Sequence, residues 1–295
     1  MSRHVLVTGA GGFVGRHLLE LLGDAALSAD VDVTDADAVA AAVRETQPRA
    51  VVHLAALSRV AESWRDPARF WEVNAVGTVN VLEAVRRERS QARVLAVSTG
   101  EVYGRTERLP TPEEAPVAPV SPYAASKAAA ELACAQAREA GVDVVVARAF
   151  QHEGPGRDDR FAVGSWARQL AALELSGGGA LMVGNLDAER DITDVRDVCR
   201  AYALLLQPSV PAEVYNVAGG RSVPLTEVVE MLAGLARVPI TVEQDPERLR
   251  PADLPVQCGD SSRLRATTGW KPEIPLERTV SDMLEAARDV AKVGV

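Results

Sequence analysis

The sequence predicts an α/β fold in which a doubly wound parallel sheet carries a smaller C-terminal lobe. Short, nearly continuous apolar runs alternate with longer helical patterns, as expected for strands that are buried on both faces and connected by helices. A glycine-rich turn lies between the first predicted strand and the first predicted helix. The 295 residues, 47% of them hydrophobic, can build one large domain or two unequal ones.

Apolar periodicity locates the individual elements. The sequence predicts strands at 5–8, 50–54, 94–98, 144–148 and 214–217. It predicts helices at 14–22, 69–86 and 123–140. After Gly23 the chain is too short for a full second strand followed by a long loop. From about residue 151 glycine and proline interrupt the pattern, so we expect shorter elements there, with late segments returning to the main sheet.

Composition excludes several classes of partner. A formal net charge of −9 argues against nucleic acid or an anionic membrane surface. Cys134, Cys199 and Cys258 lie far apart without metal-binding spacing, so we expect buried, reduced thiols and no metal site. The chain begins with a predicted strand rather than a secretory segment, and no apolar run approaches the ~18 residues of a membrane span. We therefore expect a cytoplasmic protein.

The spacing Gly9-x-x-Gly12-x-x-Gly15 lies between a predicted strand and a predicted helix. Glycines there allow a tight turn, a close approach of the backbone to a pyrophosphate and close packing of helix on strand. The helix N-terminus then offers free N–H groups and the positive end of its dipole to phosphates. The pattern predicts a Rossmann-type, NAD(P)-binding domain over residues 1–150, and residues 151–295 are expected to form mainly the substrate lobe.

The adenine end of the expected cofactor site is less clear. Asp32 is placed to meet the adenine end, but the sequence offers no clear acceptor for a ribose 2′-hydroxyl. Arg16, directly after the third glycine, either attracts a 2′-phosphate or is a solvated helix residue. The sequence favours NADPH over NADH only weakly.

Tyr123 and Lys127 have the i, i+4 spacing that places two side chains on one helix face. A nearby ammonium favours the phenolate and lowers the pKa of the phenol, which helps it to exchange a proton with a carbonyl or an alcohol. Thr99 follows a buried strand, at the sheet edge where ligands bind in α/β proteins, and is expected to contact the same oxygen. Behind a glycine loop, this order predicts a hydride-transfer site.

The chain resembles the extended short-chain dehydrogenases/reductases of the nucleotide-sugar epimerase/dehydratase family over nearly its whole length. The resemblance is carried by 8–15, 53–56, Asn74, Gly77-Thr78, Ser98-Thr99, Tyr123-x-x-x-Lys127 and Gly154-Pro155-Gly156. It implies a homodimer that pairs through the helices at 74–86 and 123–140. With the glycine loop, it implies that the cofactor is bound by Gly9, Gly12, Phe13, Val14, Gly15, Arg16, Asp32, Val33, Leu54, Ala55, Ala56, Asn74, Tyr123, Lys127 and Phe150.

Segments beyond residue 150 resemble those that the family uses around the nucleotide of a nucleotide-diphosphate sugar. The resemblance implies that Gly184 and Asn185 approach the base and that Arg190 and Arg250 hold the diphosphate or ribose, for which a guanidinium fork is well suited. Three further arginines, at positions 157, 160 and 168, are interpreted as ordinary surface residues. The residues expected to bind the substrate are Gln151, Val183, Gly184, Asn185, Arg190, Arg250 and Asp253.

Within the family, Phe150-x-His152-x-Gly154-Pro155-Gly156 and Gly269-Trp270-Lys271-Pro272 are similar to the GDP-6-deoxy-4-keto-D-mannose reductases, which form GDP-D-rhamnose. GDP-mannose 4,6-dehydratases share parts of the pattern. In dehydratases a glutamate at the position of Glu101 removes the C5 proton, so Thr99 and Glu101 do not exclude elimination. The short chain and trimmed second-strand region favour reduction; dehydration or another nucleotide-sugar epimerase activity is the alternative.

The implied mechanism transfers hydride to C4 of the 4-keto sugar while Tyr123 protonates the oxygen. Thr99, Glu101 and Lys127 complete the expected catalytic set. A regulator that keeps the fold without turnover is disfavoured because Tyr123, Lys127 and the glycine loop are intact. Two departures, Gln151 in place of the usual asparagine and Glu153 in place of an apolar residue, are expected to alter the preferred hexose.

Overall fold

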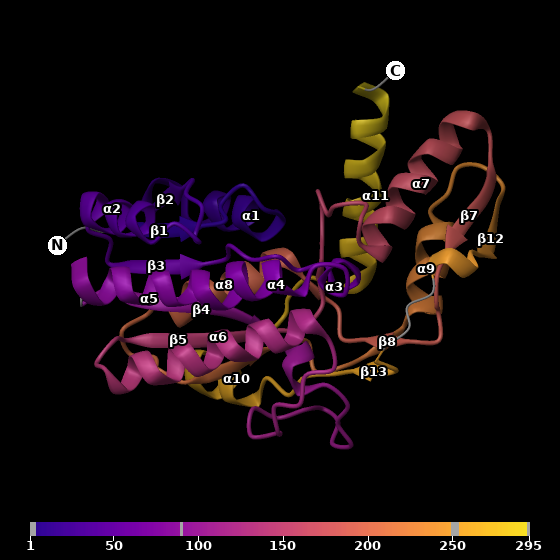
Figure 1. The fold of residues 1–295 in the computed structure, drawn as a ribbon. Coiled ribbons are helices and arrows are strands. Elements are labelled where there is room, and N and C mark those ends of the chain that lie inside the picture. Colours follow the sequence, from indigo (N-terminus) through magenta and orange to yellow (C-terminus); the bar gives the residue numbers. More distant parts are fainter. Residues whose placement is uncertain (1–3, 89–90, 249–253, 294–295) are drawn as a thin grey trace.

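The computed structural model describes residues 4–88, 91–248 and 254–293, and its centre is a six-stranded parallel sheet with the strand order β10-β5-β4-β3-β1-β2 (Figure 1). The strands are β1 (Val5–Thr8), β2 (Ala26–Ala29), β3 (Ala50–His53), β4 (Arg93–Thr99), β5 (Val144–Ala149) and β10 (Val214–Val217). The order reverses at β1, which has β2 on one side and β3 on the other. Such a reversal opens a crevice at the carboxyl ends of the strands, where ligands of this fold bind.

Helices cover both faces of the sheet. Because side chains alternate along a strand, Val5 and Val7 contact one layer while Leu6 contacts the other. This is why the strands read as continuous apolar runs. The first layer contains α1 (Phe13–Leu22), α8 (Val195–Leu205) and α10 (Ser262–Thr268). The second layer contains α2 (Ala36–Thr46), α5 (Gly77–Glu88) and α6 (Pro122–Glu139).

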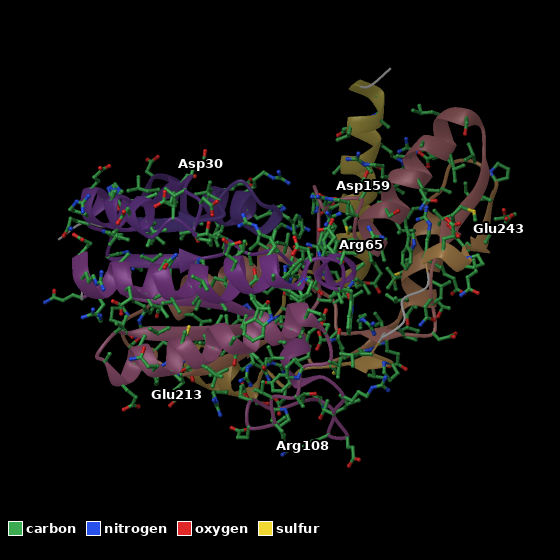
Figure 2. The ribbon with its side chains drawn as sticks, viewed as in Figure 1. Asp30, Arg65, Arg108, Asp159, Glu213 and Glu243 are labelled. Carbon is green, nitrogen blue, oxygen red and sulfur yellow. The ribbon has the colours of Figure 1, made fainter. Side chains whose placement is uncertain are left out.

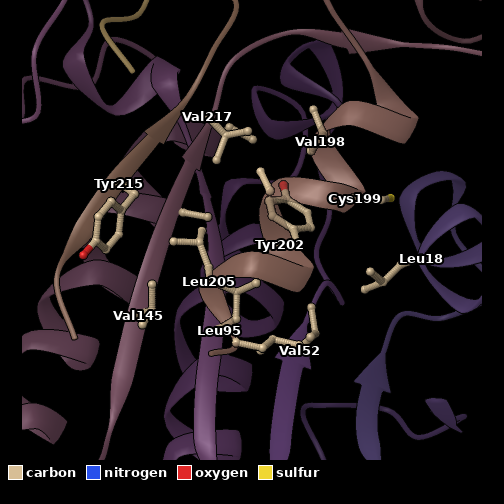
Figure 3. Packing of buried hydrophobic residues seen from close by; sticks show 14 of the residues in the cluster. Leu18, Val52, Leu95, Val145, Val198, Cys199, Tyr202, Leu205, Tyr215 and Val217 are labelled. Carbon is tan, nitrogen blue, oxygen red and sulfur yellow. The ribbon is translucent and has the colours of Figure 1, made fainter. Parts of the chain in front are cut away.

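The first layer contains the largest apolar cluster. Tyr202 and Leu205 of α8 are fully buried and pack over the strands that carry Leu95 and Val145 (Figure 3). Burying a side chain of this size stabilises a fold by roughly 1.5–3 kcal/mol. Residues 195–205 therefore cover the main sheet as a helix, and residues 214–217 join it as a strand paired with β5.

A second core lies beyond the sheet, on the right of Figure 1, around Trp166, Leu170, Leu232 and Leu284. It is built from α7 (Ala162–Ser176), β7 (Gly179–Val183), α9 (Leu225–Gly234), β12 (Ile240–Gln244) and α11 (Leu276–Val293). Short paired strands connect it to the main sheet: β6 (His152–Glu153), β8 (Glu189–Arg190), β9 (Thr193–Asp194), β11 (Val223–Pro224) and β13 (Val256–Gln257).

The predicted helix at 69–86 is helical throughout, but its middle part is a π turn instead of α-helix. The segment divides into α4 (Pro67–Phe70), a π-helical turn η2 (Trp71–Val76) and α5. The π turn lies where the buried Asn74 bonds to a neighbouring loop and to α6, and such tertiary bonds are invisible to periodicity. π turns of this kind are frequent at functional sites. The remaining short helical segments are η1 (Gly23–Ala25), α3 (Val60–Ser63), η3 (Gly100–Tyr103) and η4 (Pro246–Arg248).

The region after Gly23 forms a short second strand, the four-residue β2, which pairs with β1. The three cysteines are buried and free, as expected. Among the residues that the structure describes, no group of three His, Cys, Asp or Glu side chains is arranged to hold a metal ion. Within the same residues, no helix combines the length and apolar character needed to cross a membrane.

Candidate active site

The glycine loop connects β1 to α1 and lies directly against the turn that follows β3. Gly9 has a φ of 68°, and a Cβ built there would lie 2.6 Å from the backbone nitrogen of Ala55. A Cβ on Gly15 would meet the carbonyl oxygen of Gly9 at 2.6 Å. Both positions therefore require glycine. Gly12 precedes α1 without a side-chain cap, so the helix N-terminus keeps N–H groups to offer.

Buried polar groups fix the turn after β3. His53 bonds to Thr8 Oγ1 at 2.8 Å and to Thr78 Oγ1 at 3.1 Å, connecting β1, β3 and α5. Asn74 accepts a hydrogen bond from Leu57 N at 2.8 Å and donates one to Leu57 O at 2.9 Å. The Asn74 amide is thus used to hold the turn that contains Leu54, Ala55 and Ala56.

Three predicted catalytic side chains come together at the carboxyl end of β4. Thr99 is the last residue of β4, Glu101 lies in the η3 turn, and Tyr123 is in the first turn of α6. The Ser121 hydroxyl caps α6 by accepting a hydrogen bond from Ala124 N at 3.1 Å, and Pro122 begins the helix. These local signals place the Tyr123 phenol, which is 8% exposed, beside Thr99.

The electrostatics of Tyr123 differ from the expectation. Burial raises the pKa of the phenol above its usual value, and the negative charge of Glu101 raises it further. A hydrogen bond with Thr99 and the positive charge of Arg157 oppose the rise in pKa without cancelling it. The predicted lowering of the phenol pKa by Lys127 is therefore not found, because burial and Glu101 raise the pKa more than Thr99 and Arg157 lower it. The phenol holds its proton at neutral pH.

Lys127 lies one turn after Tyr123 and is 5% exposed. Its Nζ donates a hydrogen bond to Val97 O at 2.6 Å, which ties α6 to β4. Burial lowers the pKa of this ammonium to about 8. Lys127 therefore lies on the sheet-facing side of α6, and its described bond is to the strand.

The other expected cofactor residues differ in their burial and in the contacts they make. Val33 and Phe150 are buried, and Phe150 packs against Tyr103 with ring centroids 6.3 Å apart. Asp32 is exposed and accepts hydrogen bonds from the backbone N–H and the hydroxyl of Thr34. Val14 packs partly into the first apolar layer.

Arg157 was interpreted from the sequence as a surface arginine, and that interpretation is wrong. Its side chain is only 13% exposed and lies over the rings of Phe13 and Phe161, 4.8 and 3.7 Å from their centroids. Its Nε lies 3.4 Å from a carboxylate oxygen of Glu153, which is 1% exposed. A cation therefore joins the glycine loop to the segment after β5. In the sequence, only the adjacent Gly154-Pro155-Gly156 turn indicated that Arg157 lies near the site.

Glu153 also contacts Gln151, whose Nε2 donates to Glu153 Oε1 at 3.0 Å. Glu153 therefore does not point freely towards a sugar; it orients the amide beside it. Burial raises the pKa of this carboxyl, and Arg157 and Gln151 oppose the rise. Arg16 donates to Gly11 O at 3.4 Å and Gly156 O at 3.3 Å, so it too joins the glycine loop to this segment.

The predicted substrate residues beyond α7 are more dispersed. Val183 is 1% exposed and packs in the second core, so its side chain cannot contact a ligand. Gly184 faces the Arg248 carbonyl, 2.8 Å from a Cβ built on the glycine. Asn185 Oδ1 accepts a hydrogen bond from Asp187 N. The Arg190 guanidinium is buried and donates to Glu189 O and Leu254 O. Arg250 and Asp253 lie outside the described residues.

Comparison with known proteins agrees with this architecture. A family model for GDP-mannose 4,6 dehydratase matches residues 25–283. The chain is 39% identical to a GDP-6-deoxy-D-mannose reductase of Pseudomonas aeruginosa, with 96% of this chain and 97% of the relative covered. It is 30% identical to a GDP-mannose 4,6-dehydratase of Yersinia enterocolitica, with 88% of this chain and 78% of the relative covered.

Solved structures of similar proteins share this fold. The structure of RMD from Pseudomonas aeruginosa complexed with NADPH superposes with a TM-score of 0.89 at 36% identity, covering 97% of this chain and 99% of that one. The UDP-glucose 4-epimerase of Thermus thermophilus in complex with NAD has a TM-score of 0.85 at 30% identity, with 97% and 99% covered.

The fold and site define an extended short-chain dehydrogenase/reductase, a class of NAD(P)-dependent oxidoreductases. Within that class, the chain belongs to the family described by the GDP-mannose 4,6 dehydratase model.

Proposed function

We propose that this protein reduces the C4 ketone of a nucleotide-diphosphate 4-keto-6-deoxy sugar with NAD(P)H, converting GDP-4-keto-6-deoxy-D-mannose to GDP-D-rhamnose. The observation that carries the proposal is the buried, protonated Tyr123 beside Thr99 at the carboxyl end of β4. The 39% identity to a GDP-6-deoxy-D-mannose reductase, over almost the full length of both chains, supports the substrate class.

The residues present fit a nicotinamide dinucleotide. The glycine loop has no room for a Cβ at Gly9 or Gly15. The uncapped start of α1 offers N–H donors to a pyrophosphate. Asp32 would meet the adenine end, while Tyr123 and Lys127 would lie at the nicotinamide end. When bound, the reduced dinucleotide supplies the hydride that the protein's own side chains cannot provide.

In the proposed mechanism, Tyr123 acts as the general acid. Thr99 and the Tyr123 hydroxyl hold the ketone oxygen, and donors aimed at a developing oxyanion lower the barrier strongly. As C4 accepts a hydride, the C=O π pair moves to oxygen, and the phenol proton passes from Tyr123 Oη to that oxygen to give the alcohol. Lys127, fixed by Val97 O, keeps α6 and hence Tyr123 in position.

Reduction is favoured over dehydration by similarity, since the chain is 39% identical to a GDP-6-deoxy-D-mannose reductase and 30% identical to a GDP-mannose 4,6-dehydratase. Dehydration begins with oxidation of an alcohol, for which the phenol must first be a base, whereas ketone reduction needs it as an acid. Tyr123 is protonated at neutral pH with or without this rise in pKa, so it can act as the acid in reduction. Glu101 supports the alternative, because its carboxylate is close enough to act on the phenol's pKa and is the residue that would remove a C5 proton.

We further propose that residues 1–150 bind the dinucleotide and residues 151–295 mainly bind the nucleotide sugar. Gln151 would contact the sugar, Gly184 and Asn185 the base, and Arg190 with Arg250 the diphosphate; Asp253 would complete this set. Remote contacts of this kind would orient the ketone against Tyr123. Phe150 would act through its packing against Tyr103, behind the nicotinamide end.

The decisive test supplies purified enzyme with GDP-4-keto-6-deoxy-D-mannose and either reduced dinucleotide, follows dinucleotide oxidation by absorbance, and identifies the product by NMR. Oxidation with formation of GDP-D-rhamnose is expected. A parallel incubation with GDP-mannose and the oxidised dinucleotide tests dehydration. Formation of the 4-keto product there, with no oxidation in the first assay, would overturn the reductase proposal in favour of dehydration.

We also propose a homodimer that pairs through α5 and α6. Three apolar side chains on and beside these helices are exposed: Val76 by 50%, Val79 by 41% and Leu132 by 73%. We expect the wild-type protein to have the mass of a dimer by light scattering, and Leu132→Glu to shift it towards the monomer. A monomeric wild type would contradict the proposal. The cytoplasmic location expected from the sequence stays a prediction.

A further inference from the structure

Helix α6 carries a third ionisable side chain on the face that holds Tyr123 and Lys127, and the proposed mechanism leaves it without a role. Glu131 follows Lys127 by four positions, as Lys127 follows Tyr123, so the three residues lie on one side of the helix. The Glu131 side chain is 10% exposed, and its carboxylate lies 2.6 Å from a guanidinium nitrogen of Arg148, which belongs to β5 and is 7% exposed. A buried ion pair therefore lies one turn beyond the lysine.

The ion pair connects α6 to two strands of the sheet. Arg148 Nε donates hydrogen bonds to both oxygens of the Glu131 carboxylate, at 3.0 and 3.1 Å, and Arg148 Nη2 donates to one of them at 2.6 Å. The hydroxyl of Ser98 donates to the same carboxylate from β4. Ser98 directly precedes Thr99, so Glu131 holds α6 against the strand end that carries the second proposed catalytic hydroxyl.

Arg148 extends the same network to the η3 turn. Its Nη1 donates to the Tyr103 hydroxyl at 2.8 Å, and that hydroxyl donates to Asn216 Oδ1 on β10 at 2.7 Å. Tyr103 is the last residue of η3, which also contains Glu101. One buried polar network thus joins α6, β4 and η3, the three elements that carry the proposed catalytic side chains.

We infer that Glu131 is a positioning residue for the proposed reaction, because its bonds to Arg148 and Ser98 hold the catalytic face of α6 against the end of β4. The inference rests on the proposed function. Transfer of a proton from Tyr123 to the ketone oxygen depends on the distance between them, and a misplacement of about 1 Å can cost about 10²-fold in rate. Loss of Glu131 is therefore expected to lower turnover more than affinity.

The charges around Lys127 give Glu131 a second effect. Burial lowers the pKa of the Lys127 ammonium to about 8, and Cys134 and Glu131 oppose the fall. Burial raises the pKa of the Cys134 thiol to about 12, so this thiol is uncharged at pH 8. His53 on β3, with a pKa of about 3, is uncharged there too, and the Tyr123 phenol keeps its proton. Among these neighbours, only Glu131 carries a charge that favours the ammonium.

The sign of this charge gives the direction of the pH effect. The Lys127 ammonium favours the negative charge that develops on the Tyr123 oxygen as its proton leaves. When Glu131 is made neutral, the positive charge of Arg148 also acts against the ammonium, which then loses its proton at lower pH. Turnover should therefore begin to fall at a lower pH.

The test compares the full-length wild type with Glu131→Gln, which keeps the length of the side chain and an acceptor oxygen but not the charge. Turnover of the keto sugar should fall about tenfold or more, while KM for the sugar and affinity for the dinucleotide change by less than about threefold. The alkaline limb of turnover against pH should move down by about 0.5 pH units or more. Glu131→Asp, which keeps the charge on a shorter side chain, should restore the limb but not the full turnover.

A second measurement needs no substrate. The chain has three lysines, of which Lys271 and Lys292 are exposed and Lys127 is buried. NMR of protein isotope-labelled at the lysine Cε therefore follows Lys127 as one of three signals, and its titration gives the pKa directly. The pKa of Lys127 should be lower in Glu131→Gln than in the wild type by at least about 0.5.

The ion pair of Arg93 with Asp143 is the matched control, because it joins the same two strands, β4 and β5, at their amino ends. Arg93 Nε donates to Asp143 Oδ2 at 2.9 Å. Figure 2 shows Glu213, which directly precedes β10, at this end of the sheet. Asp143→Asn should lower the free energy of unfolding but leave turnover, the alkaline limb and the Lys127 titration unchanged.

Equal losses of turnover in Glu131→Gln and Asp143→Asn would overturn the inference, because they would reveal only a general loss of stability. Unchanged turnover in Glu131→Gln would overturn it as well. If that variant does not fold, Ser98→Ala, which removes a single bond to the carboxylate, should lower turnover about threefold, and unchanged turnover there would overturn the inference. If no keto sugar is reduced, the proposed function fails and the Lys127 titration decides: an unchanged pKa overturns the inference, and a lowered pKa leaves it standing.

Discussion

Helix α6 and the segment 151–161 both contribute side chains beside the carboxyl edge of the sheet, but they hold them by different means. In α6, a capping serine, a proline at the first position and the helical repeat fix Tyr123 and Lys127 locally. In 151–161, Gln151, Glu153 and Arg157 hold one another, and Arg157 stacks on Phe13 from a distant part of the chain.

Because of this difference, the two regions should respond differently to substitution. Residues that are positioned by their own helix and its cap depend on few neighbours, so they tolerate changes elsewhere in the protein. Residues placed by a buried polar cluster depend on every member, because removing one partner leaves another buried and unsatisfied. The four predictions that follow test the locally determined groups against the groups fixed by tertiary contacts.

The largest effect is expected for Tyr123→Phe. This change removes the proton donor and leaves the ring, so turnover of the keto sugar should fall about 10³-fold. Affinity for the reduced dinucleotide should stay within about threefold, because α6 and its cap are intact. Steady-state kinetics and fluorescence titration measure the two effects. Turnover close to that of the wild type would exclude Tyr123 as the acid.

Gly9→Ala should be the most damaging change in the glycine loop. The left-handed φ of 68° and the 2.6 Å approach to Ala55 N should cost about 3 kcal/mol of unfolding free energy and abolish dinucleotide binding. Gly11→Ala is the matched control, since a Cβ at Gly11 has no atom within 4 Å. Urea unfolding and dinucleotide titration measure both effects. Equal behaviour of the two variants would refute the packing argument.

Arg157→Met tests the cluster held by tertiary contacts. It should cost about 2 kcal/mol by leaving the Glu153 carboxylate buried without its cation, an effect smaller than for a fully buried pair because Arg157 is partly exposed. The double variant Arg157→Met with Glu153→Leu should recover most of that loss in urea unfolding. Additive losses in the double variant would show that the two side chains are not coupled.

The smallest effect concerns His53. Burial, with a smaller contribution from the charge of Lys127, lowers the pKa of this imidazole from 6.5 to about 3. Between pH 6.5 and about 3 the His53 imidazole binds a proton in the unfolded chain but not in the folded protein. The free energy of unfolding therefore falls as the pH decreases. From pH 7 to 5.5 the loss should be about 1 kcal/mol.

The measurement is urea unfolding at the two pH values, with His53→Gln as comparison. The variant keeps groups that can bond to Thr8 and Thr78 but has no imidazole, so the pH dependence should decrease by about 1 kcal/mol. An identical pH dependence in both proteins would contradict the assignment to His53.

The predicted fold depended on features that are visible over short stretches of sequence. Strand 214–217 was located by its apolar run and pairs with β5 at those residues. The π turn within the helix at 69–86 was not predicted, because it lies where Asn74 bonds to Leu57 and Ser126, which are distant in sequence. The same limitation led Arg157 to be interpreted as a surface residue, since Phe13 becomes its neighbour only in the folded chain.

The sequence by itself determined the parallel α/β sheet, the glycine loop and the Tyr123–Lys127 face of α6, because each follows from a repeat or a turn within a few residues. Only the tertiary structure decided the raised pKa of Tyr123, the bond of Lys127 to Val97 and the position of Arg157 over Phe13. Burial, register and the distance between charges are properties of the packed chain, and short-range sequence patterns do not encode them individually.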